Sequence, residues 1–332
     1  MEGAKQMDVR DLVDPAYRTL VEQLAANPAD WSNPAKVRAD RRALQPPAPI
    51  PDTVAWHDHD ALGPEGAPPV MVRLYRPMDQ SGPLPCIYWI HGGGYMGGTA
   101  DSANETASEW VMSLNCVVAS VEYRLAPENP YPAPIEDCYA GLRWLTNSAA
   151  DLQIDPDRIV IGGGSAGGGL CAALALLVRD RGELKVSHQV LLYPMIDDRR
   201  NRPSHAWDTW VWTKQSNETG WRAYLGNLFD TDNVPAYAAP SRATDLTNLP
   251  PAYILVGSLD LFLSEDIDYA ERLLEAGVPT ELHIYAGGPH GFDVPALGGK
   301  AELGRRARAD TAEYLRRAFA TTATRADVTA AG

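Results

Sequence analysis

The chain has few cysteines and no long apolar run, and each shortage narrows what it can be. Its four cysteines lie far apart among 332 residues without a C-x-x-C pair, which favours buried reduced thiols over a disulfide framework or a zinc site. Its best apolar run, residues 170–178, is shorter than the roughly 18 residues of a membrane-spanning helix. The N-terminal residues carry early acids and no apolar signal-peptide core. We therefore expect a soluble, cytoplasmic protein.

Basic side chains are also scarce. There are 29 lysines and arginines against 43 aspartates and glutamates, which gives a net charge of −14. A surface of this sign repels phosphate backbones and anionic lipids, so we expect no nucleic-acid partner and no membrane partner. The apolar fraction of 45% and the charged fraction of 22% are ordinary values for an ordered globular chain. A chain of this size can bury its core without disulfides or a metal.

Short apolar runs, by contrast, recur along the sequence. From residue 86 onward these runs alternate with segments of helical period. Continuous apolar runs are typical of strands that are buried on both faces. The pattern therefore predicts an α/β fold with a mostly parallel sheet and helices on both of its faces. The runs are CIYWI, CVVASVEY, RIVIGG, HQVLLYP, AYILVG and ELHIYA.

The same patterns divide the chain into segments. Two helices are predicted near the N-terminus, each opened by a capping side chain and a proline, at Asp14 and Asn33. Two strands are predicted at residues 53–61 and 69–77, before this alternation begins. The predicted segments are N-terminal cap helices (1–50), a first part of the core (51–196), a cap insertion (197–240), a second part of the core (241–320) and a flexible tail (321–332).

The insertion is rich in tryptophan, with four of the nine in the chain. One interpretation is a helix packed on the core, because four apolar residues share a helical spacing: Trp221, Tyr224, Leu225 and Leu228. The other is a lid that covers a pocket together with the N-terminal helices. The candidate pocket residues of that lid are Trp207, Trp210 and Trp212.

A G-x-S-x-G motif is centred on Ser165, between a predicted strand and a predicted helix. Gly163 and Gly167 flank the serine at two residues on either side, where a Cβ would collide as strand and helix close up. The turn exposes the hydroxyl at the N-terminus of a helix, whose dipole favours negative charge. This placement predicts a nucleophilic serine.

A second motif, His91 followed by Gly92, Gly93 and Gly94, comes directly after the buried run at residues 86–90. Glycine backbone can turn its N–H donors toward one point. Together with the N–H of Ala166, these donors would hold the negative oxygen of an acyl-transfer intermediate. The motif therefore predicts an oxyanion hole.

A base and an orienting acid are also needed, and position along the chain selects them. Of the seven histidines, only His290 occupies a loop just past the carboxyl end of a late strand, and Asp260 directly follows the run at 252–257. Such strand ends meet at one edge of a parallel sheet. We expect His290 to act as the base for Ser165 and Asp260 to orient it. The order serine, aspartate, histidine is that of the α/β-hydrolases.

These motifs resemble those of the hormone-sensitive-lipase-like carboxylesterases, also called bacterial family IV esterases. The resemblance covers roughly residues 10–320. It rests on the HGGG motif, on EYRLAPE at 122–128 followed by YPA, on GGSAGG around the serine, on Asp260 and on HGF at 290–292. It implies an α/β-hydrolase fold with a helical cap, no cofactor or metal, and a possible homodimer. The implied activity is hydrolysis of short- to medium-chain acyl esters of small molecules.

The resemblance also implies a role for each motif residue. Ser165 would be the nucleophile, His290 the general base and Asp260 the orienting acid, while Gly93, Gly94 and Ala166 would donate to the oxyanion. The remaining motif residues, which support this geometry, are His91, Gly92, Gly163 and Gly167.

Two departures from the family pattern concern loops beside the site. The family usually has Asp before the serine, where this chain has Gly164, and it favours D-P-L-x-D-E after the catalytic Asp. Here Leu261 and Ser264 stand at the proline and second aspartate positions. Each departure removes a side chain that could brace a loop, so we expect effects on substrate preference more than on activity.

Other functions remain open at this point. Two G-x-G-x-x-G matches, at residues 92–97 and 162–167, would suit a dinucleotide enzyme, but neither explains the serine, aspartate and histidine together. His57 to Asp60 is rich in metal ligands, yet on a strand its histidines and aspartates face opposite sides. An amidase or deacetylase could use the same three residues. A non-catalytic binding protein could share the fold, as the plant gibberellin receptors do after losing the histidine.

Overall fold

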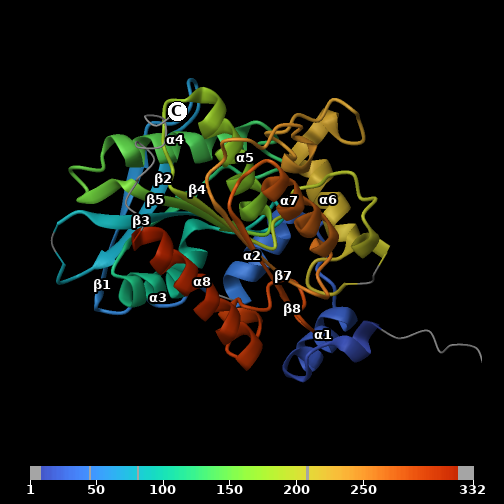
Figure 1. Cartoon of the computed structure of the whole chain (residues 1–332). Coiled ribbons are helices and arrows are strands. Elements are labelled where there is room, and N and C mark those ends of the chain that lie inside the picture. The colour runs from blue at the N-terminus through green and yellow to red at the C-terminus, as the bar shows by residue number, and fades with distance from the viewer. Residues whose placement is uncertain (1–8, 45, 81, 207–208, 321–332) are drawn as a thin grey trace, which may run out of the picture.

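The computed structural model describes residues 9–44, 46–80, 82–206 and 209–320. Within them the chain forms one eight-stranded sheet in the order β1-β2-β4-β3-β5-β6-β7-β8 (Figure 1). β2 pairs antiparallel with β1 and β4, and the other pairs are parallel, so the predicted mostly parallel sheet is confirmed. The predicted tail lies outside the described residues. The strands are β1 (Val54–Ala61), β2 (Val70–Pro77), β3 (Leu84–Ile90), β4 (Val117–Glu122), β5 (Ile154–Gly164), β6 (His188–Leu192), β7 (Ala252–Gly257) and β8 (Thr280–Tyr285).

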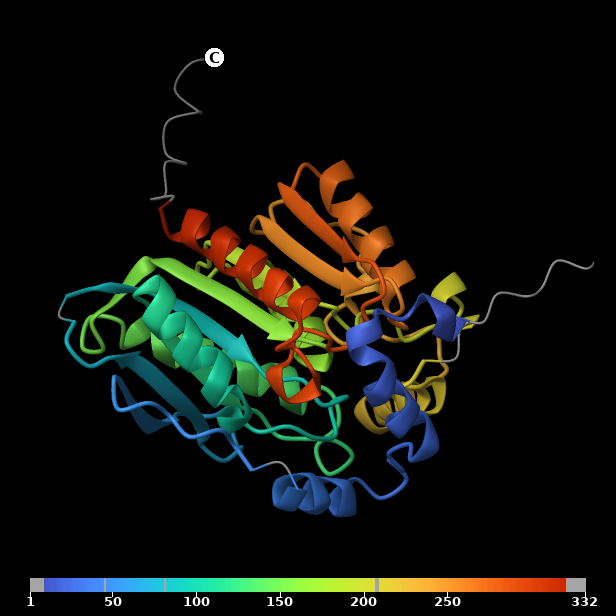
Figure 2. The same ribbon diagram turned by 90° about the horizontal axis from the view of Figure 1, so that it is seen from below.

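Helices cover both faces of this sheet, which is why the central strands are apolar throughout. Every residue of β3 and of β7 is buried. Helices α3 and α8 contact each other on one face, and α4 and α5 contact each other on the opposite face (Figures 1 and 2). The helices are α1 (Arg18–Ala26), α2 (Pro34–Leu44), α3 (Asn104–Leu114), α4 (Ala133–Asn147), α5 (Ala166–Arg181), α6 (Lys214–Leu225), α7 (Leu263–Glu275) and α8 (Glu302–Ala320).

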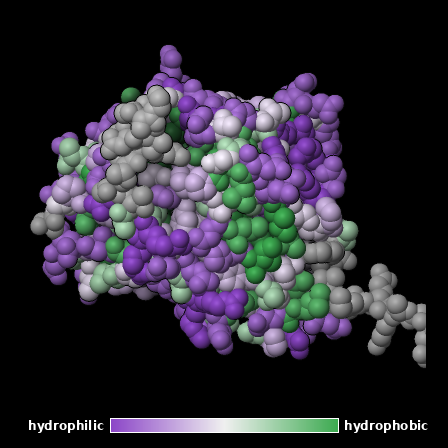
Figure 3. Space-filling view, viewed as in Figure 1, coloured by the Kyte–Doolittle hydropathy of each residue, from purple (hydrophilic) through white to green (hydrophobic). Residues whose placement is uncertain are grey.

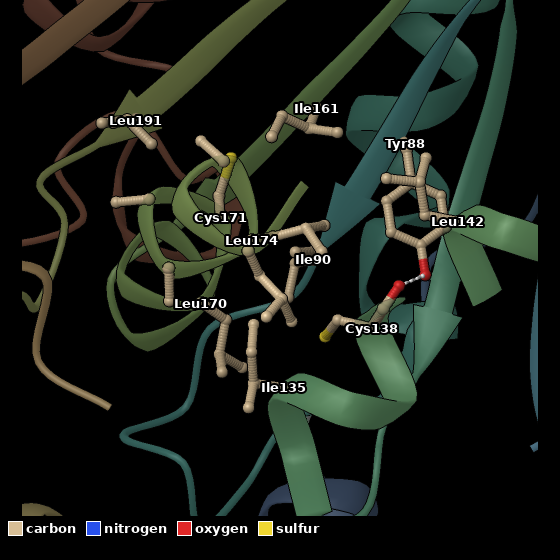
Figure 4. Packing of buried hydrophobic residues seen from close by; sticks show 14 of the residues in the cluster. Tyr88, Ile90, Ile135, Cys138, Leu142, Ile161, Leu170, Cys171, Leu174 and Leu191 are labelled. Atoms are coloured by element: carbon tan, nitrogen blue, oxygen red, sulfur yellow. Dashed lines mark hydrogen bonds between the residues drawn. The ribbon is translucent and has the colours of Figure 1, made fainter. Parts of the chain in front are cut away.

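The core between the sheet and the α4–α5 face is packed with aliphatic side chains (Figure 4). Its one polar contact in Figure 4 is a hydrogen bond of 2.8 Å from the Tyr88 hydroxyl to the Cys138 carbonyl. All four cysteines are free and buried, as predicted. Burial raises the pKa of the Cys171 thiol, so this sulfur stays protonated and unreactive. The side chains labelled there include Ile90, Ile135, Leu142, Ile161, Leu170, Leu174 and Leu191.

The N-terminal helices and the segment around α6 lie together beyond the carboxyl ends of the parallel strands (Figure 2). The predicted caps form, since the Asp14 side chain accepts from the Ala16 N–H and the Asn33 side chain from the Lys36 N–H. The two segments touch where the Trp31 and Trp212 rings meet edge to face at 6.0 Å.

The helix predicted inside the insertion is α6, and it packs on the core. Trp221, Tyr224 and Leu225 are buried, whereas Leu228 falls in the short 3₁₀-helix that follows. Tyr224 stacks on Tyr95 of the loop after β3, with ring centroids 4.0 Å apart. This packing holds the insertion against the edge of the sheet where the candidate residues lie.

The face of the molecule in Figure 3 is mostly hydrophilic, with a hydrophobic area near β7 and β8. β8 is an edge strand, and Ile284 within it is 47% exposed. No helix among the described residues is both long and apolar enough to cross a membrane.

The anchoring of α6 can be tested by truncating its central aromatic residue. Trp221 is fully buried against Tyr95, so Trp221→Ala should lower the free energy of unfolding by about 3–5 kcal/mol, measured by urea denaturation. The neighbouring Arg222 is exposed and pairs with Glu218 on the same helix. Arg222→Ala should therefore cost less than about 1 kcal/mol. Equal losses in the two variants would contradict this account of the anchor.

Candidate active site

Ser165 sits on a sharp turn between β5 and α5, in the left-handed region at φ 56°. The flanking glycines let strand and helix approach, because a β-carbon at Gly163 would lie 2.2 Å from the Gly167 carbonyl oxygen. A β-carbon at Gly167 would lie 2.1 Å from the carbonyl oxygen of Ile90 on β3. Neither position has room for a side chain, which is the steric reason the G-x-S-x-G pattern predicted.

The segment after β6 holds this turn from the side. The Ser165 N–H donates to the Leu192 carbonyl at 2.9 Å, and the Ser165 carbonyl accepts from the Met195 N–H at 3.0 Å. The Gly169 N–H also donates to the Ser165 carbonyl, at 3.0 Å. The serine backbone is therefore fixed by both the helix that follows it and the neighbouring strand.

The three residues predicted from separate strand ends come together in one line. His290 Nε2 lies 3.0 Å from Ser165 Oγ, and His290 Nδ1 lies 2.8 Å from Asp260 Oδ2. Asp260 follows β7, and His290 lies in the loop after β8. Asp260 is fully buried, whereas Ser165 and His290 are 8% and 7% exposed, so the line opens to solvent at the serine end.

Asp260 is itself oriented by the loop that departs from the family pattern. Its Oδ1 accepts from the Phe262 N–H at 3.0 Å, and the Phe262 ring meets the His290 ring edge to face at 5.2 Å. Ser264, which stands where the family favours an aspartate, makes two hydrogen bonds that brace this loop. Its hydroxyl accepts from the Ser204 N–H, and its N–H donates to the Ser204 hydroxyl. The insertion thus supplies the brace from outside the loop.

Glu265, the next residue, is a buried carboxyl that joins two segments of the chain. The sequence did not indicate this role. It accepts from the N–H groups of Ile196 and Asp197 and contacts His205 Nε2 at 3.1 Å. Burial raises the pKa of Glu265 to about 7. The contact links the start of the insertion to the helix that follows Asp260.

The HGGG loop begins at a buried histidine and carries backbone N–H groups without acceptors. His91 stacks on Tyr123 at 4.3 Å and is buried, which lowers the pKa of its imidazole to about 4 and keeps it neutral. Gly93 and Gly94 have φ values of 127° and 63°, which glycine adopts without strain. Within the described residues, neither of their N–H groups has an acceptor. The N–H of Ala166 opens α5, where helix donors are free as a rule.

The candidate pocket tryptophans have different surroundings. The Trp212 ring covers Gly94, since a β-carbon at Gly94 would lie 2.0 Å from Trp212 Cη2. Trp212 Nε1 donates to Asn217 at 3.2 Å, which fixes the ring. Trp210 is buried in the hydrophobic cluster that includes Phe292. Trp207 lies outside the described residues.

Two further features were weighed as sites. A cleft of about 630 Å³ lies away from the three aligned residues, and each of the four arginines that line it has a partner. Asp197 binds Arg199 and Arg202, Asp198 binds Arg242, and a backbone carbonyl accepts from Arg272.

On β1, Asp58 pairs with Arg73 and His59 packs on Trp144. No cluster of three or more metal-ligating side chains occurs in the described ranges.

Comparisons with known proteins agree with this architecture. Residues 87–294 match a family model described as the alpha/beta hydrolase fold. Esterase LipI of Mycobacterium tuberculosis is 35% identical over 292 residues, which cover 86% of this chain and 89% of that protein. Carboxylesterase NlhH of the same organism is 34% identical over 286 residues, covering 84% and 88%. The solved structure of a bacterial heroin esterase is 39% identical, with a TM-score of 0.89 over 94% of this chain and 99% of that one.

The sequence resemblance is thereby confirmed over most of the chain, by curated relatives and by a solved structure. The chain belongs to the hormone-sensitive-lipase-like family of α/β-hydrolases and is a carboxylic ester hydrolase.

Proposed function

We propose that this enzyme hydrolyses short- to medium-chain acyl esters through an acyl-enzyme formed on Ser165. The observation that carries the proposal is the line from Ser165 Oγ to His290 Nε2 at 3.0 Å and from His290 Nδ1 to Asp260 Oδ2 at 2.8 Å. Such a line joins a nucleophile, a base and an orienting acid within hydrogen-bond reach. The names of the similar proteins, esterase and carboxylesterase, support the same chemistry.

In the first half of the reaction, His290 accepts the Ser165 proton as Oγ attacks the carbonyl carbon of the ester. The carbonyl oxygen becomes negative and accepts hydrogen bonds from the oxyanion donors: Gly93, Gly94 and Ala166. His290 then gives its proton to the alcohol oxygen, which leaves with the electron pair of the broken C–O bond. Asp260 stabilises the imidazolium and keeps its Nδ1 proton in place.

In the second half, a water molecule takes the place of the alcohol. His290 removes a proton from the water, and the resulting hydroxide attacks the acyl carbon. The tetrahedral intermediate uses the same donors and collapses when His290 returns the proton to Ser165 Oγ. The carboxylic acid is released, and no cofactor is needed.

We propose that residues 1–50 and 197–240 form the cap over this site and that Trp212 limits the acyl chain. The contact of Trp212 with Gly94 supports this role, because the indole lies against the loop that carries the oxyanion donors. Trp207 and Trp210 stay candidates for the same pocket. The substrate side of the proposal is thus a small ester with limited acyl volume.

A cytoplasmic location and a homodimer complete the proposal. Four buried free cysteines support a reducing compartment. The edge strand β8, with Ile284 nearly half exposed, supports pairing with a second copy.

Replacement of the nucleophile tests the chemistry. Ser165→Ala should lower kcat for p-nitrophenyl butyrate by about 10⁶, because removal of one member disables the whole assembly. The matched control is Ser113→Ala on α3, where the hydroxyl bonds only its own helix. That control should keep wild-type kcat. More than a few per cent of activity in Ser165→Ala would refute the nucleophile assignment, and a p-nitroanilide substrate run alongside separates esterase from amidase activity.

Acyl length tests the pocket. Each buried methylene contributes up to about 0.8 kcal/mol, so kcat/KM should rise with chain length until the acyl group meets bulky side chains. Overpacking of about 1–3 kcal/mol should then reverse the trend, with an optimum near C4 to C8. Trp212→Ala should move the optimum toward longer chains.

The control for this series is Trp56→Ala, because Trp56 lies on the edge strand β1 and is 44% exposed. It should leave the chain-length profile unchanged. A profile in Trp212→Ala that matches the wild type, in protein that remains folded by thermal unfolding, would show that Trp212 does not limit the acyl chain.

A further inference from the structure

Tyr193, the first residue after β6, has strained backbone beside the nucleophile. Its φ is 38°, in the left-handed region that non-glycine residues seldom adopt and that is enriched at functional sites. Its N–H donates to the Leu255 carbonyl of β7 at 2.6 Å. Its neighbours Leu192 and Met195 make the two hydrogen bonds to the Ser165 backbone described above. Tyr193 is therefore tied to the strand before Asp260 and to the turn that carries Ser165.

From this position the Tyr193 ring reaches the candidate base. It meets the His290 ring edge to face, with centroids 4.8 Å apart and planes at 69°. Phe262 makes a second edge-to-face contact with the same ring, at 5.2 Å. In an acyl-enzyme, Ser165 Oγ has no proton to donate to His290. Among the hydrogen bonds and ring contacts of His290 within the described residues, those to Asp260, Tyr193 and Phe262 are then left to orient the imidazole.

Asp293 supplies a buried carboxyl three residues after His290, in the loop that follows β8. Only 6% of Asp293 is exposed, and its Oδ1 has no partner among the described residues. Burial raises the pKa of Asp293, while its side-chain interaction with Tyr193 acts in the opposite direction. Arg308 of α8 donates to the backbone carbonyl of Asp293 at 3.0 Å, which fixes the backbone that carries this carboxyl. A buried carboxyl oxygen without a hydrogen bond is costly, so a donor such as the Tyr193 hydroxyl would stabilise Asp293.

Gly164 connects this pair to the departure from the family pattern. A β-carbon at Gly164 would lie 3.5 Å from Tyr193 Cε2 and 3.7 Å from the Tyr193 hydroxyl oxygen, which are ordinary contact distances. The aspartate that the family usually has at this position would therefore place a carboxyl near the same hydroxyl. This chain has no side chain there and has Asp293 instead.

We propose that Tyr193 is a positioning residue that keeps the His290 ring aligned for ester hydrolysis, and that the carboxyl of Asp293 anchors the Tyr193 hydroxyl. The inference rests on the proposed function. Asp293 acts through Tyr193, and its carboxyl takes the place of one delivered from residue 164. Neither residue exchanges a proton with the substrate.

The test compares single variants that keep side-chain volume. Asp293→Asn and Tyr193→Phe should each lower kcat for p-nitrophenyl butyrate by about 10-fold and leave KM within about twofold, because a misaligned base slows the chemical step and not binding. The matched control is Tyr314→Phe, which removes a buried hydroxyl without a partner from α8. It should keep wild-type kcat. Thermal unfolding of each variant ensures that rates are compared per folded protein.

Rescue provides the second readout. Gly164→Asp alone should stay within about twofold of wild-type kcat, and Gly164→Asp combined with Asp293→Asn should recover most of the activity lost in Asp293→Asn. Wild-type kcat in both Asp293→Asn and Tyr193→Phe would overturn the proposal. A double variant no better than Asp293→Asn, when Gly164→Asp alone is active, would overturn the exchange of carboxyl positions. Full activity in Ser165→Ala would instead overturn the proposed function.

Discussion

The arrangement of the site depends on backbone-to-backbone contact at the turn around Ser165. Strand β5 and helix α5 approach so closely there that a β-carbon at Gly163 would overlap the Gly167 carbonyl oxygen. Helix α5 also approaches β3, where a β-carbon at Gly167 would overlap the Ile90 carbonyl oxygen. The HGGG loop joins the same contact, because a β-carbon at Gly92 would lie 2.7 Å from the Gly164 carbonyl oxygen. Ser165 and the HGGG loop thus share one packed region of bare backbone. Their relative position does not depend on flexible side chains.

The parallel strands bring the other two aligned residues to this turn. The loops after β5, β7 and β8 end at one edge of the sheet, and each contributes one of the three aligned residues. Two further ties hold the loops in place, one from the Ser204 pair with Ser264 and one from Glu265 to the backbone after β6. The alignment of His290 therefore reflects the sheet, the insertion and α7 together.

The features that sequence reasoning reached are those encoded by neighbours in the chain. Strands covered on both faces have continuous apolar runs, and a close turn requires glycine at fixed spacing, so the sheet and the placement of Ser165, Asp260 and His290 could be predicted. The contact of Trp212 with Gly94, and that of Tyr193 with His290, join segments about 100 residues or more apart. No local pattern encodes such contacts. The only feature of the sequence that accompanies the strained backbone of Tyr193 is the Tyr-Pro pair directly after β6.

The cover of Gly94 by Trp212 has a consequence for how such an enzyme could diversify. Gly93 and Gly98 are confined by backbone oxygens less than 2.5 Å from any added β-carbon, and Gly94 is confined by the indole. Point mutations in the HGGG loop therefore have almost no room to reshape the site. Trp212 belongs to the insertion, where it packs on Trp31, and volume can be exchanged between two side chains in contact. New substrate ranges in proteins of this build should therefore arise by mutation of the insertion, while the HGGG loop stays as it is.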